Sequence, residues 1–206
     1  GSGVNYINPK VPLDQQAIPK KPLLFLKHFS SIVYNPKEIT FSKLHGPVNH
    51  EVELGFIMSK GGKNIPRERA MEYVGGYFLL LDFTYSSIGE GRKNGESWCL
   101  YKNAENFWPV SDYVEKSAVK DPHNIDLELK INGKVRQAGN TGEMIFKIPE
   151  LISFTSKFLT LNEGDMFLTG TPPGIDKVND GDYLKAKMSE NGNTLASLSL
   201  KVNYEK

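Results

Sequence analysis

The chain has 206 residues, of which 39% are hydrophobic and 24% charged, and its formal net charge is +1. These values are typical of one globular domain, and so small a net charge gives no strong field for nucleic acid or an acidic membrane. The single cysteine, Cys99, excludes an internal disulfide framework and favours a reducing, intracellular compartment. No apolar run has the length of a transmembrane helix.

The beginning of the chain is polar and predicts little regular structure. Residues 4–22 are rich in Pro, Lys, Gln and Asn and are expected to form an irregular lead-in to a single domain spanning residues 1–206. The Gly1-Ser2-Gly3 start, without an initiator methionine, is expected to be a cloning remnant at least in part. A mitochondrial and a cytosolic location therefore both stay open.

Most of the remaining chain predicts short strands, because apolar runs of strand length and alternating apolar and polar residues recur between turn residues. The expected strands are Pro22–Lys27, Glu38–Phe41, Glu51–Met58, Tyr77–Leu81, Asp126–Ile131, Lys134–Gln137, Asp165–Thr169, Tyr183–Met188 and Leu195–Tyr204.

Two segments predict helices. Pro66–Val74 has a proline start and helical spacing, with Gly75-Gly76 expected to stop it, and Ile148–Leu161 has apolar residues at helical intervals. Ser86–Ser97 is polar and glycine-rich and is expected to be a mobile loop. Asn132-Gly133 predicts a hairpin turn. This pattern predicts a β-rich α+β fold, a mixed sheet roll or barrel with a few short helices.

The segment His50–Gly55 carries the clearest chemical signal. Strand side chains alternate between faces, so Glu51 and Glu53 point the same way, roughly 7 Å apart along the strand. Val52 and Leu54 then point towards the core. Neighbouring carboxylates repel each other, and hard divalent cations such as Mg²⁺ and Mn²⁺ relieve that repulsion. A solvated strand face that happens to carry two glutamates is the alternative.

Several segments, in order along nearly the whole chain, together resemble the fumarylacetoacetate hydrolase family, in its small acylpyruvate-hydrolase-like branch. They are Pro22–Lys27, His50–Gly55, Tyr73–Tyr77, Leu81–Thr84, Asp121–Asn124, Gly139–Thr141, Met144–Phe146 and Glu163–Gly174. Each motif is weak alone, and their common order makes the set specific.

The resemblance implies a fold of the family's C-terminal domain type, usually in a homodimer, with one divalent metal per active site. The family's two glutamates and later aspartate fall on Glu51, Glu53 and Asp82. Three carboxylates suit a hard, oxygen-ligated ion. Mg²⁺ is the first expectation and Mn²⁺ the second, and Ca²⁺ can fill such sites in crystals.

The resemblance also implies a small 2-oxo or 2,4-dioxo acid as substrate, and neither nucleic acid nor membrane as a partner. Lys102 matches a catalytic lysine that stabilises negative charge, and Thr171 matches a threonine that helps to hold the substrate carboxylate. Lys27 ends a strand near the same region, where it is expected either to face the substrate or to form a structural salt bridge.

The chain departs from the family pattern at two places. Acylpyruvate-hydrolysing relatives have a histidine and a glutamate, three residues apart, soon after the Asn-Tyr that is Asn5-Tyr6 here, but no histidine precedes His28. That pair activates the attacking water. Relatives also carry a substrate-binding arginine and glutamine where this chain has Ser86 and Gly89. Arg92 is the candidate replacement cation.

These losses leave several functions open. Acylpyruvate or fumarylpyruvate hydrolysis needs a base for water, whereas decarboxylation or tautomerisation of oxaloacetate chiefly needs enolate stabilisation by metal and lysine. A metal-dependent C–C hydrolase or lyase, or a tautomerase, is therefore expected. The alternative is a catalytically degenerate relative that keeps metal and fold and acts as a binding or structural protein.

Overall fold

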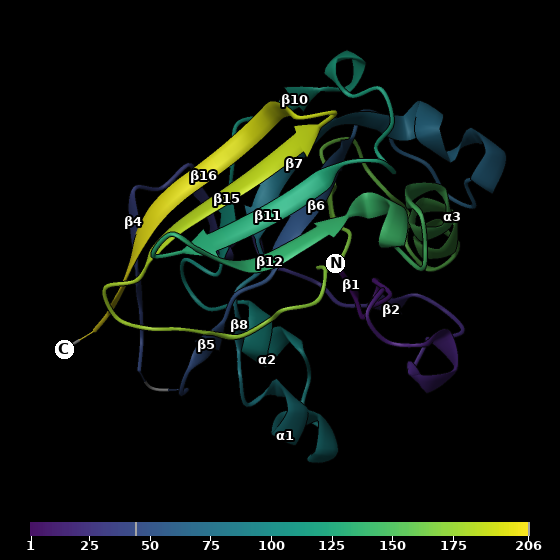
Figure 1. Ribbon diagram of the computed structural model, residues 1–206. Helices are drawn as coiled ribbons and strands as arrows, with labels where there is room; N and C mark the ends of the chain where they lie inside the picture. Colours follow the sequence, from purple (N-terminus) through teal and green to yellow (C-terminus); the bar gives the residue numbers. More distant parts are fainter. Residues whose placement is uncertain (44, 206) are drawn as a thin grey trace.

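Two sheets packed face to face dominate the computed structural model, which describes residues 1–43 and 45–205 (Figure 1). The five-stranded sheet has the order β12-β11-β15-β16-β4. Its strands are β4 (Glu38–Phe41), β11 (Asp126–Ile131), β12 (Lys134–Asn140), β15 (Tyr183–Glu190) and β16 (Asn193–Tyr204). All its pairs are antiparallel except β16 with β4, which makes the sheet mixed.

The second sheet carries the site. Its order is β13-β6-β7-β9-β3, and β10 also pairs with β7. Its strands are β3 (Ile32–Tyr34), β6 (Val52–Met58), β7 (Val74–Leu81), β9 (Trp108–Val110), β10 (Val114–Glu115) and β13 (Met166–Leu168). The main core lies between the two sheets, and Leu54, Leu79, Leu129 and Leu198 are among its fully buried members. The predicted β-rich mixed fold is confirmed.

Smaller elements close the ends of this sandwich. Two small sheets are formed by β1 (Ser2–Gly3) with β2 (Leu23–Leu24), and by β5 (Val48–Asn49) with β8 (Thr84–Tyr85) and β14 (Lys177–Val178). The helices are α1 (Ile88–Lys93), α2 (Cys99–Lys102) and α3 (Ile148–Phe158). Short 3₁₀ segments lie at Leu13–Gln15, Phe29–Ser31, Arg67–Tyr73, Lys116–Ala118 and Thr141–Glu143. Figure 1 shows α1 and α2 projecting together from one end of the sheets, with α3 beside another.

The alternating runs behave as the sequence predicts. Along Asp126–Ile131 every second residue is buried, because one face of β11 packs on the core. Asn132 and Gly133 both have positive φ, 50° and 80°, as the tight hairpin between β11 and β12 requires. The helix predicted at Ile148–Leu161 is α3, which ends three residues earlier, at Phe158.

Three local expectations were wrong. Gly75-Gly76 does not end an element but lies inside β7, where a side chain on Gly76 would come within 2.4 Å of the Tyr113 ring. Arg67–Tyr73, inside the helix expected at Pro66–Val74, is 3₁₀ rather than α-helical. Ser86–Ser97, expected to be a loop, contains α1, in which Gly91 packs tightly against Tyr101. Close packing, which local composition does not report, decides the two glycine cases.

The polar lead-in is tied to the domain despite its irregular course. Ser2–Gly3 pairs with Leu23–Leu24, so the residues expected to be a remnant form part of a small sheet. The Asn5 amide donates to the carbonyls of Phe146 and Thr169, at 3.0 and 2.8 Å, and its Oδ1 accepts from the Phe146 N–H at 2.8 Å. Asn5 thereby brings the lead-in against the end of β13.

Candidate metal centre and active-site cavity

Three carboxylates meet at one end of the β6–β7 pair. Glu51 directly precedes β6, Glu53 lies within it, and Asp82 directly follows β7. The strands are antiparallel with Val52 opposite Leu81, so these ends coincide, and the Asp82 N–H donates to the Glu51 carbonyl at 2.8 Å. One oxygen of each of the three carboxylates lies within 4.8 Å of the others. The sequence prediction that Glu51 and Glu53 share a face agrees with this geometry.

The neighbouring residues confirm the alternation. Val52 and Leu54 are fully buried in the core. His50 points away from the carboxylates and contacts the Gln137 amide oxygen through its Nδ1, at 2.8 Å. The 2.0-residue period of a strand therefore separates the polar and apolar side chains of this segment.

Two buried lysines hold the two oxygens of Asp82. Lys27 Nζ lies 2.7 Å from Oδ1 and donates to the Phe107 carbonyl at 3.2 Å, and Lys102 Nζ lies 2.6 Å from Oδ2. Lys102 also contacts Glu51 Oε2 at 3.2 Å. The side chains of Lys27, Lys102 and Asp82 are 1%, 3% and 0% exposed, so these ion pairs are shielded from water. Three carboxylates and two ammonium groups leave a formal charge of −1.

The pKa values of the cluster reflect this arrangement. Burial alone would raise the pKa of Asp82, but Lys102 and Lys27 outweigh it and hold that pKa below its usual range. Burial opposes the charge on Lys102, yet Asp82 and Glu51 raise its pKa well above normal. Burial, together with the charges of Asp82 and Glu51, raises the pKa of Glu53 well above its ordinary value. Without a cation, the surroundings of Glu53 therefore disfavour its negative charge, and a bound cation would relieve that penalty.

Residues that the sequence analysis did not single out orient these carboxylates. Thr84, two residues beyond Asp82, donates from Oγ1 to Glu51 Oε1 at 3.0 Å and accepts from Lys102 Nζ at 2.8 Å. The Gly170 N–H donates to Glu53 Oε2 at 2.8 Å. Strand alternation after Asp82 was the available signal for Thr84, whereas nothing local pointed to Gly170.

Gln137 connects the metal strand to the turn that carries Thr171. Its Oε1 accepts from the Val52 N–H at 3.1 Å as well as facing His50, and its Nε2 donates to Thr171 Oγ1 and the Pro172 carbonyl, both at 2.8 Å. Thr171 Oγ1 in turn donates to the Val52 carbonyl at 2.8 Å. The predicted threonine is thus fixed beside the carboxylates by a glutamine on β12.

A cavity of about 500 Å³ opens over this cluster. Glu51, Thr84 and Lys102 line its inner end, Thr171 lies on one wall, and Arg92 lies on α1 at the other side. The predicted residue Lys27 does not line this cavity, because its ammonium is committed to Asp82, which is the salt bridge that was one of its two expected roles. No histidine is among the described residues that line the cavity.

Comparison with known proteins gives the chain its family. Residues 1–202 match the family described as fumarylacetoacetate (FAA) hydrolase C-terminal. The chain belongs to this family. A solved structure described as a fumarylacetoacetate hydrolase family protein from Yersinia pestis CO92 shares the fold, with a TM-score of 0.87 at 32% identity, covering 98% of this chain and 90% of that chain.

Several relatives of this chain are named as oxaloacetate tautomerases. The chain is 42% identical over 190 residues to the mitochondrial oxaloacetate tautomerase FAHD1 of Oryza sativa subsp. japonica, covering 90% of this chain and 82% of that protein. It is 40% identical over 189 residues to the mitochondrial oxaloacetate tautomerase FAHD1 of Homo sapiens, covering 91% of this chain and 84% of that protein.

A solved structure extends the comparison to bound ligands. The fumarylpyruvate hydrolase of Pseudomonas aeruginosa, in complex with Mn²⁺ and pyruvate, superposes with a TM-score of 0.87 at 28% identity, covering 98% of this chain and 88% of that chain.

In the described part of the present chain, no helix is both long and apolar enough to cross a membrane.

Proposed function

We propose that this protein is a divalent-metal-dependent enzyme that promotes enol chemistry of a small 2-oxo acid, namely tautomerisation or decarboxylation of an oxaloacetate-like substrate. The observation that carries the proposal is the contact of the Lys102 ammonium with Asp82 and Glu51 at the inner end of a cavity. The tautomerase relatives at about 40% identity, and the neighbour with Mn²⁺ and pyruvate, support it.

Glu51, Glu53 and Asp82 would hold the ion. Their converging oxygens are the donors that hard cations prefer, and the residual charge of −1 suits a divalent cation. Mg²⁺ is our first assignment and Mn²⁺ our second, since both favour carboxylate oxygens. When bound, the ion supplies Lewis-acid stabilisation of negative charge on a substrate oxygen.

The chain's own residues supply the rest. Lys102 presents a buried ammonium that stabilises charge on the substrate as an enolate forms, and Thr84 holds that ammonium in place. Thr171, fixed by Gln137, borders the space for the substrate carboxylate. Lys27 holds Asp82 in position from the far side of the cluster. These groups are preorganised before substrate arrives, which is the condition for electrostatic stabilisation to be effective.

Hydrolysis is a weaker assignment than enol chemistry. A water nucleophile needs a base within hydrogen-bonding reach, and Val4, Asn5 and Tyr6, where the lead-in meets the cavity, offer neither imidazole nor carboxylate. The same observation favours the second candidate, a protein that binds metal and an oxo acid without turnover.

We also propose that the protein forms a homodimer, as its family relationship suggests. Strand β3 is an edge of the six-stranded sheet, and the exposed apolar side chains Leu26, Phe29 and Tyr34 lie on and just before it. Exposed apolar side chains near a sheet edge favour association. Light scattering on a sizing column measures the mass directly.

The deciding experiment is turnover of oxaloacetate with Mg²⁺ or Mn²⁺ against an EDTA control, with acetylpyruvate as rival substrate. Metal-dependent loss or enolisation of oxaloacetate without acetylpyruvate hydrolysis is the expected result. Hydrolysis of acetylpyruvate would overturn the preference for enol chemistry. Absence of both activities, with metal still bound, would favour the binding protein.

A further inference from the structure

The Arg92 guanidinium stands at the rim of the active-site cavity. Arg92 is exposed on α1 and lines the cavity, and within residues 1–43 and 45–205 its guanidinium contacts an aromatic ring rather than an acid. Its Cζ lies 4.9 Å from the ring centroid of Trp98. Most surface arginines are simply solvated, but this one faces a cavity whose inner end holds the candidate metal centre.

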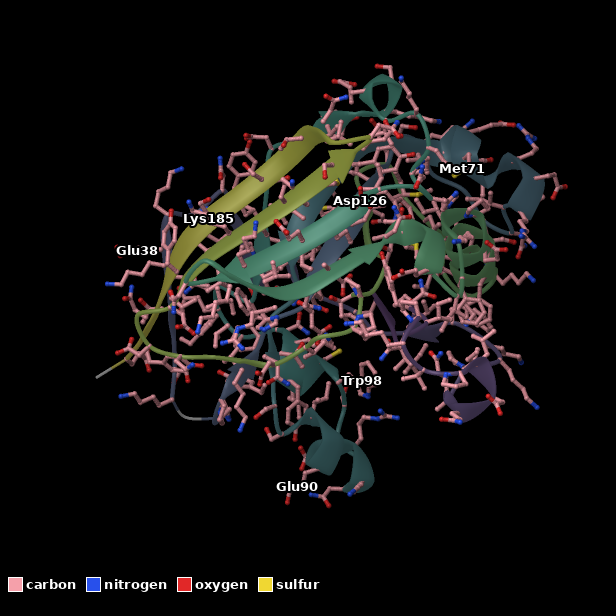
Figure 2. The ribbon with its side chains drawn as sticks, viewed as in Figure 1. Glu38, Met71, Glu90, Trp98, Asp126 and Lys185 are labelled. Carbon is pink, nitrogen blue, oxygen red and sulfur yellow. The ribbon has the colours of Figure 1, made fainter. Side chains whose placement is uncertain are left out.

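The Trp98 ring that contacts this guanidinium is itself held in place by packing. The indole packs against Gly3, where an added Cβ would come within 2.6 Å of the ring, and against Phe25, with centroids 5.8 Å apart. In Figure 2 Trp98 lies between the α1–α2 segment and the N-terminal strands, whereas Glu90 points outward at the tip of α1. The face of an aromatic ring attracts a cation, so the contact with Trp98 favours positions of the Arg92 guanidinium beside the cavity.

The aromatic pair also links two cations. Lys102 Nζ lies 4.6 Å from the Phe25 centroid, so the contacts run from Lys102 through Phe25 and Trp98 to Arg92. Lys102, Trp98 and Arg92 line the cavity. Lys102 is at the carboxylate cluster and Arg92 is at the rim. Gly89, one helical turn before Arg92, also lines the cavity, and a Cβ there would meet no atom within 4 Å. Space for a ligand group therefore exists beside the guanidinium.

We infer that Arg92 binds the distal carboxylate of the substrate, so that the site selects 2-oxo dicarboxylates over 2-oxo monocarboxylates. This inference rests on the proposed function. The 2-oxo acid end of the substrate would bind at the carboxylate cluster and Lys102. A second carboxylate at the other end of the substrate would then reach the Arg92 guanidinium, whose planar pair of N–H donors suits a carboxylate. The assignment makes Arg92 a specificity residue.

The test compares a dicarboxylate with a monocarboxylate in the same assay. Enolisation of oxaloacetate and of pyruvate is measured as deuterium exchange at C3, monitored by NMR. The assay contains saturating Mg²⁺ and no Mn²⁺, and each rate is corrected for the uncatalysed exchange. The variants are Arg92→Gln and Arg92→Lys. Lys93→Gln is the matched control, because it removes the same charge from the neighbouring exposed position, which does not line the cavity.

Arg92→Gln is expected to lower kcat/KM for oxaloacetate roughly 10- to 100-fold, as loss of a charge-assisted hydrogen-bonded pair does, while changing pyruvate less than about twofold. Arg92→Lys keeps the charge and should lose part of the preference. Lys93→Gln should change neither substrate. Equal losses for both substrates, or no loss for either, would overturn the assignment of Arg92.

Oxalate binding separates this failure from failure of the proposed function. Oxalate has the adjacent oxygens of a 2-oxo acid but no distal carboxylate, so its calorimetric Kd with Mg²⁺ should be the same in the wild type and in Arg92→Gln. Weaker oxalate binding in Arg92→Gln would overturn a distal role. If the wild type neither enolises oxaloacetate nor binds oxalate, the proposed function itself is wrong.

Discussion

The Lys102 ammonium lies 2.6 Å from Asp82 Oδ2, while the opposite oxygen of that carboxylate accepts from Lys27. A single buried aspartate therefore joins the candidate metal cluster to two cations of different roles. Lys102 reaches the cavity and Lys27 does not. Both lysines are buried partners of Asp82, so changes at either should cost stability, but only a change at Lys102 should also act directly on chemistry.

Loss of Lys102 should act on turnover. Lys102→Met is expected to lower oxaloacetate turnover at saturating metal by at least about tenfold, because the charge that forms on the substrate loses its nearest ammonium. Metal affinity should be kept, since the site becomes more negative. Steady-state rates and a Mn²⁺ titration measure the two effects. An unchanged rate would remove Lys102 from the mechanism.

Loss of Lys27 should act on stability. Lys27→Met leaves Asp82 Oδ1 and the Phe107 carbonyl without their donor, and removing one partner of a buried ion pair costs about 3–5 kcal/mol. Urea unfolding measures this loss in free energy. Exposed Lys21, replaced in the same way, is the control and should change stability by less than about 0.5 kcal/mol. A Lys27 loss as small as the control's would contradict the buried-pair interpretation.

Glu53→Gln should separate metal binding from folding. Burial and two neighbouring carboxylates raise the pKa of Glu53, so a neutral amide removes a charge that these surroundings disfavour in the metal-free protein. Stability without metal should be kept, and stabilisation by Mn²⁺, about 2.7 kcal/mol at 100 times Kd, should be lost. Thermal melts with and without Mn²⁺ test this, with exposed Glu163→Gln as the control. A full Mn²⁺ shift in Glu53→Gln would remove Glu53 from the ligand set.

Gln137→Leu should weaken both fold and substrate binding. The change leaves the Val52 N–H without its acceptor and removes the donor to Thr171 Oγ1, and each buried group left unpaired costs roughly 1–3 kcal/mol. We expect at least about 2 kcal/mol of lost stability in urea and a higher KM for oxaloacetate. The exposed Gln15→Leu is the control. Stability within error of the wild type would show that water replaces the amide.

Protonation of His123 should make the protein less stable in mild acid. Its Nε2 accepts from the Ile148 N–H at the start of α3, and burial, with repulsion from Lys147, lowers its pKa. The folded state then binds fewer protons than the unfolded state. The contribution of His123 is therefore complete above the unfolded pKa of about 6.5 and is lost as the pH falls through the folded pKa.

A glutamine at position 123 offers an acceptor that does not titrate. Between about pH 7.5 and about pH 5.5 the wild type should lose roughly 0.3–1 kcal/mol more than His123→Gln, since a cation at a helix N-terminus opposes the helix dipole. Melting temperatures of both proteins across this range measure the difference. Parallel curves would mean that His123 protonation is not coupled to folding.

The predictions that held are those that depend on neighbouring residues. Alternation placed Glu51 and Glu53 on one face and Val52 in the core, and Asn132-Gly133 predicted a turn that needs two positive φ angles. The prediction failed at Gly75-Gly76, which a strand tolerates because the Tyr113 ring covers the glycine backbone and Tyr113 Oη donates to the Gly75 carbonyl at 2.7 Å. That ring comes from a distant segment, so local composition could not report it.

The sequence by itself determined the strand periodicity, and with the family resemblance it identified three carboxylates as candidate metal ligands and Lys102 as a candidate catalytic residue. Only the tertiary structure decided that Lys27 pairs with Asp82 and that Gln137 donates to Thr171. It also decided that Arg92 lies beside the cavity in contact with the Trp98 ring. Strand geometry repeats every two residues and can be read locally. The ion pairs and ring contacts join residues far apart in the chain, and only packing of the sheets brings them within reach.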